Sequence, residues 1–95
     1  MVVAEFSVTP IVGDDLRPYV DAAVDEVKKS GLKYEVDAMS TTIEGDLQQV
    51  INVIQKAHDA VKQKGADRVL TEIRIDDRAE GVSIEEEVEG YRSMV

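Results

Sequence analysis

Four polar side chains lie in two alternating stretches of the sequence and could carry chemistry. Glu5 and Ser7 alternate with apolar residues near the N-terminus, and Thr42 and Glu44 flank an isoleucine mid-chain. Successive side chains of a β-strand point to opposite faces, so each pair shares one face of its strand. If the strands are neighbours and water is excluded, two close carboxylates repel, and one needs a cation or a hydrogen-bond donor. The pattern predicts a site for a cationic ligand or a general acid or base; a wet face without a role is the alternative.

The periodicity of the apolar residues predicts the elements that position these side chains. Alternation indicates strands at 2–9, 32–38, 40–44 and 68–76. Helical spacing indicates helices within 14–30 and 46–65, with Asp14 or Asp15 as the cap of the first. This β-α-β-β-α-β order is typical of an α+β ferredoxin-like sandwich, with an antiparallel sheet of strand order 4-1-3-2 and both helices on one face. Alternation places the four polar residues and Arg74 on the other, open face.

The C-terminal residues predict a further amphipathic helix over 83–95. Ser83 and Glu86 match a capping box. Apolar residues then follow at helical spacing: Ile84, Val88, Tyr91 and Val95. The two-helix sandwich is complete without this stripe, so the helix must pack on its own domain or on a partner subunit, and we expect the partner.

Length and composition limit the function classes. The 95 residues predict a single domain spanning 1–95. A net charge of −9 argues against nucleic acid and anionic membranes as partners and favours a cationic ligand. The absence of cysteine excludes disulfides and thiolate chemistry. Neither a leader-like segment nor a membrane-length apolar run is present, so we expect a cytoplasmic protein.

Other chemically distinctive residues have ordinary structural explanations. His58, the only histidine, lies at the edge of an apolar helix stripe and is expected to be a packing residue, since one histidine without cysteine cannot build a recognisable zinc site. The Asp76-Asp77-Arg78 segment is typical of a turn, although Arg74 and Arg78 could bind an anion. The three glutamates at 85–87 are expected to form a solvated helix face. We therefore expect neither a metal nor a cofactor.

Three stretches resemble the small thiamine-binding protein family, whose members are stand-alone domains of about this length. They are AEFSVTP (Ala4–Pro10), MSTTIEG (Met39–Gly45) and IDDR (Ile75–Arg78). The resemblance implies a ferredoxin-like fold, dimers that assemble into tetramers and, in some members, binding of thiamine or its hydroxymethylpyrimidine part.

The family motif matches this sequence residue by residue. The matching residues are Glu5, Ser7, Met39, Thr41, Thr42 and Glu44, with Ser40 at a position where glycine is common. Alternation selects Thr42 for the open face because it shares a face with Glu44, and Thr41 is the competitor if the register slips. A ligand ring would pack on Met39 or aliphatic groups, or on Tyr91 of a partner subunit.

These observations predict a non-catalytic small-molecule binding protein for thiamine or a related cationic heteroaromatic compound. A second copy would cover the open sheet face, so that the site lies at a subunit interface of a homo-oligomer, expected to be a tetramer built as a dimer of dimers. The expected ligand-binding residues are Glu5, Ser7, Met39, Ser40, Thr42, Glu44 and Arg74, without catalytic residues. The alternatives are an enzyme that uses Glu5 or Glu44 as acid or base, and a purely structural oligomeric domain.

Overall fold

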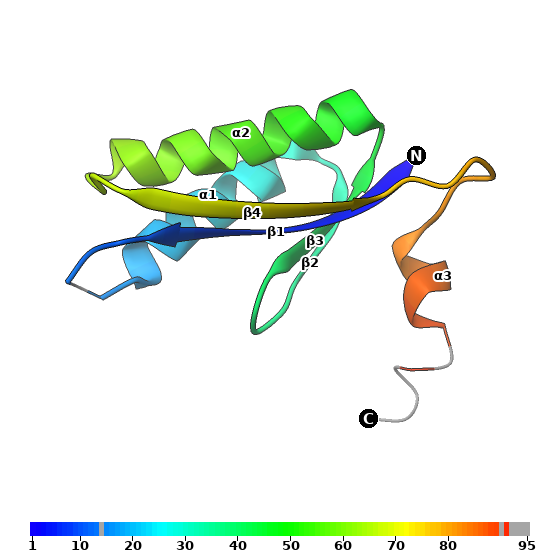
Figure 1. Ribbon diagram of the computed structural model, residues 1–95, viewed down its shortest axis with the longest axis horizontal. Coiled ribbons are helices and arrows are strands. Elements are labelled where there is room, and N and C mark those ends of the chain that lie inside the picture. Colours follow the sequence, from blue (N-terminus) through cyan, green and yellow to red (C-terminus); the bar gives the residue numbers. More distant parts are fainter. Residues whose placement is uncertain (14, 90, 92–95) are drawn as a thin grey trace.

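The computed structural model describes residues 1–13, 15–89 and 91. Its elements are β1 (Val2–Pro10), α1 (Arg17–Ser30), β2 (Lys33–Val36), β3 (Thr41–Gly45), α2 (Leu47–Gln63), β4 (Val69–Asp76) and α3 (Ile84–Val88). The four strands form an antiparallel sheet of order β2-β3-β1-β4 (Figure 1). Read from the other edge, this order is 4-1-3-2, so the predicted ferredoxin-like fold and strand order are confirmed.

The main core lies between the sheet and the two long helices. Ala4 and Phe6 of β1 and Ile43 of β3 are 1%, 4% and 0% exposed, and they pack with Val27 of α1 and Val50 of α2. Apolar and polar residues alternate in these strands because the long helices cover only one face of the sheet. The face opposite the long helices carries a second, smaller apolar cluster of Val3, Val82 and Ile84.

Local chemistry fixes the helix ends. The cap of α1 is Leu16 and not the predicted Asp15, whose carboxylate accepts a hydrogen bond from the Arg17 amide at 3.0 Å; Asp14 lies outside the described residues. Gly31 ends α1 with φ 73°, a left-handed conformation that glycine adopts without a Cβ penalty. His58 Nδ1 lies 2.6 Å from Thr71 Oγ1, so the predicted packing histidine is hydrogen-bonded between α2 and β4.

Two strand boundaries differ from the prediction, and the difference moves one candidate residue. β2 ends at Val36 and β3 begins at Thr41, so Ser40 lies in the hairpin turn instead of a strand, beside Met39, which was predicted between the two strands. The Asp37 amide donates to the Ser40 carbonyl at 2.9 Å, which closes this turn and leaves Met39 88% exposed at its tip.

The C-terminal helix is shorter than predicted and packs on its own chain. Ser83 caps α3 by accepting from the Glu86 amide at 3.2 Å, as the sequence pattern indicates. The helix ends at Val88, because Glu89 has an extended ψ of 131°, and Val95 lies outside the described residues.

The helix packs through Ile84, which is 2% exposed and contacts Val3 of its own sheet. The start of the stripe is therefore buried without a partner subunit, contrary to our expectation. Within the described residues, no helix has the length and apolar character that crossing a bilayer requires.

Candidate functional site

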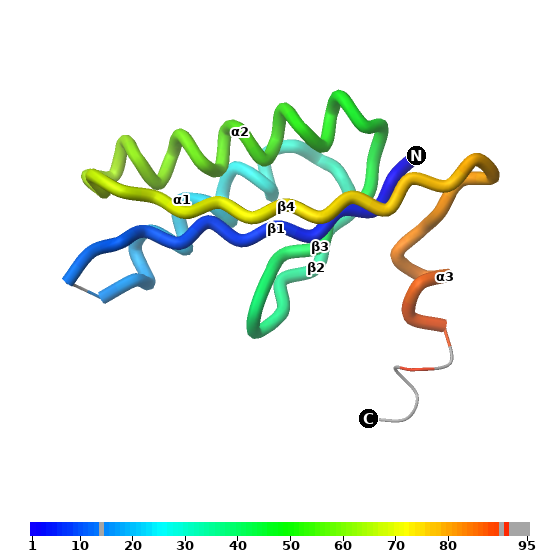
Figure 2. The backbone as a smooth tube through the Cα atoms, viewed as in Figure 1, coloured from blue at the N-terminus to red at the C-terminus, as the bar shows by residue number. Residues whose placement is uncertain are grey.

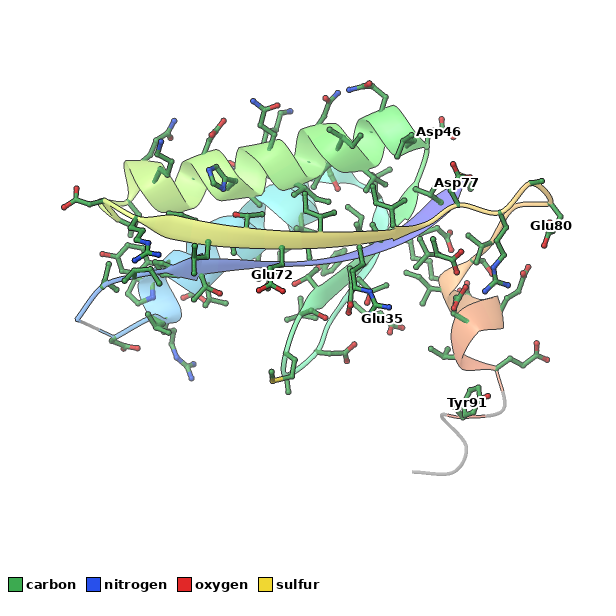
Figure 3. All side chains as sticks on the ribbon, in the orientation of Figure 1. Glu35, Asp46, Glu72, Asp77, Glu80 and Tyr91 are labelled. Atoms are coloured by element: carbon green, nitrogen blue, oxygen red, sulfur yellow. The ribbon has the colours of Figure 1, made fainter. Side chains whose placement is uncertain are left out.

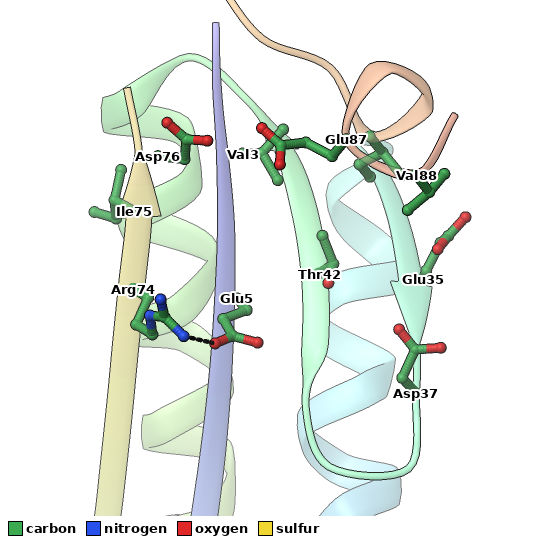
Figure 4. Close-up of a pocket in the computed structure, with 11 residues that line it drawn as sticks. Val3, Glu5, Glu35, Asp37, Thr42, Arg74, Ile75, Asp76, Glu87 and Val88 are labelled. Atoms are coloured by element: carbon green, nitrogen blue, oxygen red, sulfur yellow. Dashed lines mark hydrogen bonds and ion pairs between the residues drawn. The ribbon is translucent and has the colours of Figure 1, made fainter. Parts of the chain in front are cut away.

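The open face of the sheet holds a pocket of about 720 Å³ (Figure 4). Strands β1, β3 and β4 form its floor, whereas the β2–β3 hairpin and α3 form its walls. Figure 2 shows that the hairpin turn and α3 both lie on the side of the sheet opposite α2. The lining residues are Val3, Glu5, Glu35, Asp37, Thr42, Arg74, Ile75, Asp76, Ile84, Glu87 and Val88.

The strand register brings three predicted residues to the pocket floor. Glu5 of β1 pairs with Thr42 of β3 on one side and with Arg74 of β4 on the other. Directly paired residues of antiparallel strands point to the same face. Arg74 Nη1 lies 3.3 Å from Glu5 Oε1, and Ser40 Oγ donates to Glu5 Oε2 at 3.0 Å. Glu5 is therefore held by donors on both carboxylate oxygens at the centre of the sheet.

Glu44 lies on the same face, but its carboxylate binds a backbone amide of α3, whereas that of Glu5 binds side-chain donors. Its cross-strand partner is Val3, which makes it a diagonal neighbour of Glu5. Glu44 Oε1 accepts a hydrogen bond from the Ile84 amide at 2.7 Å, at the first turn of α3. The first amides of a helix lack a partner within the helix, so a carboxylate from β3 satisfies one of them. Glu44 thus fixes a wall of the pocket and is not among its lining residues.

A smaller hollow of about 150 Å³ joins the hairpin turn to the sheet. It collects five of the seven predicted site residues, and its lining is Glu5, Phe6, Ser7, Met39, Ser40, Glu72 and Arg74. Glu5 and Arg74 line both cavities, so the two cavities share one ion pair. Of the seven, Glu44 alone lines neither.

Four acidic residues of the large pocket were missing from the predicted site. They are Glu35, Asp37, Asp76 and Glu87. The first two alternate with apolar residues in the second strand, and Asp76 shares the open-face parity of Arg74, so alternation alone could have found these three. Glu87 had no such signal, because its position depends on how α3 folds back onto the sheet.

Arg78 joins β4 to α3 through two carboxylates. Its Nη2 lies 3.1 Å from Asp76 Oδ2 and 2.9 Å from Glu87 Oε1. A hydrogen bond between the two carboxyl groups, together with Arg78, lowers the pKa of Asp76, and the same hydrogen bond raises the pKa of Glu87. Asp76 raises the pKa of Arg78 in return.

These contacts correct one expectation for this region and bear on one alternative that the sequence left open. Glu87 is not part of a purely solvated helix face, because its carboxylate lines the pocket and pairs with Arg78. Glu85 pairs with Lys33 of β2. Arg78 is paired with two carboxylates, which disfavours the alternative that it binds an anion together with Arg74.

The charge of the large pocket favours cations. Five carboxylates and one guanidinium line it, and the guanidinium is already paired with Glu5. Clefts lined by one sign of charge raise the local concentration of the opposite ion. No group of three or more potential metal-ligating side chains gathers anywhere in residues 1–13, 15–89 and 91. The arrangement suits an organic cation that also offers hydrogen-bonding groups.

Comparison with known proteins points to one family. A family model described as thiamine-binding protein matches residues 4–92. The chain is 42% identical over 81 residues to a UPF0045 protein of Methanothermobacter thermautotrophicus, covering 82% of each chain. It is 41% identical over 86 residues to the UPF0045 protein YqgV of Bacillus subtilis, covering 82% of this chain and 81% of that one.

Solved structures agree with the sequence matches. A Bacillus cereus structure of the domain of unknown function DUF77 superposes with a TM-score of 0.92 at 41% identity, over 98% of this chain and 91% of that one. A candidate thiamine biosynthesis or salvage protein of Thermotoga maritima superposes with a TM-score of 0.87 at 32% identity, over 96% of this chain and 98% of that one.

Proposed function

Because this chain belongs to the thiamine-binding protein family, we propose that it binds thiamine or a related cationic heteroaromatic compound on its open sheet face. The single observation that carries the proposal is the acidic pocket there, in which five carboxylates surround a floor with one guanidinium. A thiazolium ring is permanently positive, so such a pocket complements its charge.

The remaining lining groups suit a flat heteroaromatic ligand. Val3 and Val88 offer apolar surface, and the Thr42 hydroxyl can donate or accept a hydrogen bond. An aminopyrimidine presents both an amino donor and ring acceptors, which a carboxylate and a hydroxyl can pair. Met39 and Tyr91 are 88% and 71% exposed, so both remain available to pack on a ring.

A second copy of the chain is the proposed cover for the site. The pocket is a wide cavity on one face of the molecule, whereas binding sites for small ligands enclose most of the ligand surface. Stacking two open faces would roof over Glu5 and Arg74 and bring exposed side chains of the partner to the ligand. We therefore propose a homo-oligomer, a tetramer built as a dimer of dimers, with the ligand between subunits.

The proposed role is binding without turnover. Glu5 accepts from Arg74 and Ser40, and Glu44 accepts from a backbone amide. Carboxylates held in this way act as fixed acceptors, which favours the binding role over acid or base catalysis by either residue. The proposal includes a cytoplasmic location, which cell fractionation with an antibody against the protein would test.

Titration calorimetry with thiamine and with free hydroxymethylpyrimidine tests the proposal. Thiamine should bind more tightly than the neutral pyrimidine, and the difference should shrink as salt is added, since salt screens charge. Thiamine should be recovered unchanged after prolonged incubation. The absence of both heat and a shift in melting temperature at millimolar thiamine would remove the proposal.

Two substitutions locate the site. Asp37→Asn removes a pocket charge that has no partner in the described chain, and should raise the Kd for thiamine roughly threefold. Glu5→Gln leaves the Arg74 charge uncompensated in the pocket and should raise the Kd about tenfold. Asp59→Asn makes the same charge change at an exposed position on α2 and is the matched control, with an unchanged Kd expected.

A further inference from the structure

The two neighbours of β1 differ in length, and the difference leaves part of β1 without a partner on one side. The register with β3 runs from Val2 to Phe6, whereas the register with β4 continues to Pro10. The turn between β2 and β3 bends to the side of the sheet opposite α2 (Figure 2). Residues 7–10 of β1 therefore border a notch in the sheet, which the hairpin turn closes at one end.

The alternation of the backbone places one free peptide edge in this notch. The Ile11 amide donates to the Arg68 carbonyl at 2.8 Å, in the register that joins β1 to β4. In an antiparallel pair every second residue directs both its amide and its carbonyl to the partner strand, so Ser7 and Thr9 also face β4. The amide and the carbonyl of Val8 consequently point into the notch. Neither has a backbone partner in the described part of the chain.

An apolar groove of about 190 Å³ lies against this edge, between α1 and the hairpin turn. Val8 and the fully buried Val27 are among the residues that line it. Its rim carries Leu16, Val20 and Val36, which are 43%, 45% and 50% exposed. Exposed apolar side chains gathered around one hollow are typical of a ligand-binding groove. Apolar cavities of about 150 Å³ hold one benzene-sized molecule, so the groove has room for one ring with a short substituent.

The charges around the groove favour an uncharged occupant. Asp37 is the only charged residue among the described residues that line it, and it also lines the acidic pocket. Figure 3 shows the side chains of Glu35 and Glu72 on the face of the sheet opposite α2, whereas α1 borders the groove. An anion would meet Asp37 and a chain of net charge −9. An ammonium group would leave the Val8 amide without an acceptor. The complementary group is neutral and offers one acceptor beside one donor.

We propose that this groove is a second small-molecule site, which binds an uncharged cyclic carboxamide: one apolar ring that carries a primary or lactam amide. The ring lies between α1 and the hairpin turn. The amide oxygen of the ligand accepts from the Val8 amide, and its N–H donates to the Val8 carbonyl, as one residue of a neighbouring strand would do. The site takes a neutral molecule and uses residues of α1 that the acidic pocket lacks. It therefore stands or falls independently of thiamine binding.

An NMR titration of the isotope-labelled protein with benzamide tests the site. Benzamide should shift the backbone amide signals of Val8 and Val20 and saturate in the millimolar range, while the amide of Thr42 on the open face keeps its position. N,N-dimethylbenzamide has the ring and the carbonyl but no N–H, so it should bind about fivefold more weakly. The proposal fails if the Val8 signal does not move, if the shifts centre on Thr42, or if both compounds bind equally.

Two proline variants test the free peptide edge. Val8→Pro removes the amide proton that points into the notch, so it should abolish the benzamide-induced shift at Val20 without breaking a hydrogen bond of the sheet. Pro10, two residues further along β1, already lacks an amide proton on that side. Thr9→Pro removes an amide that faces β4 and should lower the melting temperature more. Equal losses in melting temperature, or benzamide binding that survives Val8→Pro, would contradict the proposal.

Two serine variants test the apolar wall of the groove. Val20→Ser shortens its rim on α1 and should raise the Kd for benzamide about fourfold, because contact with roughly one methylene group is lost. Ile51→Ser is the matched control on α2, where Ile51 is 41% exposed and lies outside the groove, and its Kd should equal that of the unaltered chain. A Val20→Ser variant that binds benzamide as tightly as Ile51→Ser does would overturn the proposal.

Discussion

Replacing Glu44 by alanine should release α3 from the sheet while leaving the main core folded. The Glu44 carboxylate accepts from the Ile84 amide at 2.7 Å and is the side-chain anchor between β3 and the first turn of α3. The core between the sheet and the long helices does not include Glu44. In the described part of the chain, α3 adds to this bond the small apolar cluster of Val3, Val82 and Ile84 and exposed ion pairs of Glu85 and Glu87. The effect should therefore be local.

The magnitude follows from the type of bond. A hydrogen bond to a charged group contributes about 1.5–3 kcal/mol, and the lower end applies because this one is only partly buried. A loss of about 1.4 kcal/mol raises the population of the opened state roughly tenfold. Amide hydrogen exchange reports such local openings, so the Ile84 amide should exchange about ten times faster. Amides of Val50 and Val61 in α2 should keep their exchange rates.

One conservative variant and one control variant test this prediction further. Glu44→Gln retains an acceptor oxygen without the charge and should give an intermediate exchange rate at Ile84. Asp59→Ala truncates an exposed acid on α2 and should leave α3 unchanged. If exchange at Ile84 in Glu44→Ala equals that of the control, the carboxylate does not hold the helix, and our account of this wall of the pocket fails.

Three further predictions concern a core residue, the glycine that ends α1 and the pair of carboxyl groups beside Arg78. Ile43 is 0% exposed, so Ile43→Ala should lower the free energy of unfolding by about 2–5 kcal/mol in urea denaturation; a loss near zero would mean that the site collapses freely. Gly31→Ala should cost about 1 kcal/mol from backbone strain at φ 73° alone, because no atom lies within 4 Å of the added Cβ. In an NMR titration Glu87 should titrate above 4.5 and Asp76 below 3.8. The ionised Asp76 then stabilises the fold above its unfolded-state pKa, and this stabilisation is lost as the pH falls through its lowered pKa. The protonated Glu87 stabilises the fold in acid, and this stabilisation is lost as the pH rises through its raised pKa. Titration of the two groups in the reverse order would contradict the hydrogen bond between them.

Alternation and helical spacing predict most of this fold because the sheet has one covered face. In β1, every second residue must be apolar to reach the helices, so the parity of Phe6 also assigns Glu5 to the open side. The strand order follows from short connections and right-handed crossovers. Boundaries were less accurate at the hairpin, since the turn is closed by a backbone bond between Asp37 and Ser40 that side-chain periodicity does not encode.

The walls of the site were harder to predict than its floor. Glu5, Thr42 and Arg74 meet because strand register fixes them, and register is readable from alternation. The position of α3 depends on contacts between segments far apart in sequence, such as that of Glu44 with the Ile84 amide. An amphipathic pattern predicts that one side of a helix is buried, but it does not identify the surface that buries it. The sequence therefore cannot distinguish packing of α3 on its own sheet from packing on a partner subunit.

The central place of β1 determines the order in which this chain can fold. Its pairing with β4 joins Val3 to Asp76, so β1 completes its hydrogen bonds only after β4 has left the ribosome. Closing so long a loop costs entropy before any contact repays it, and such non-local pairing slows folding. Until then β1 lacks one of its two neighbours, and the two helices can dock only on the three strands that precede β4.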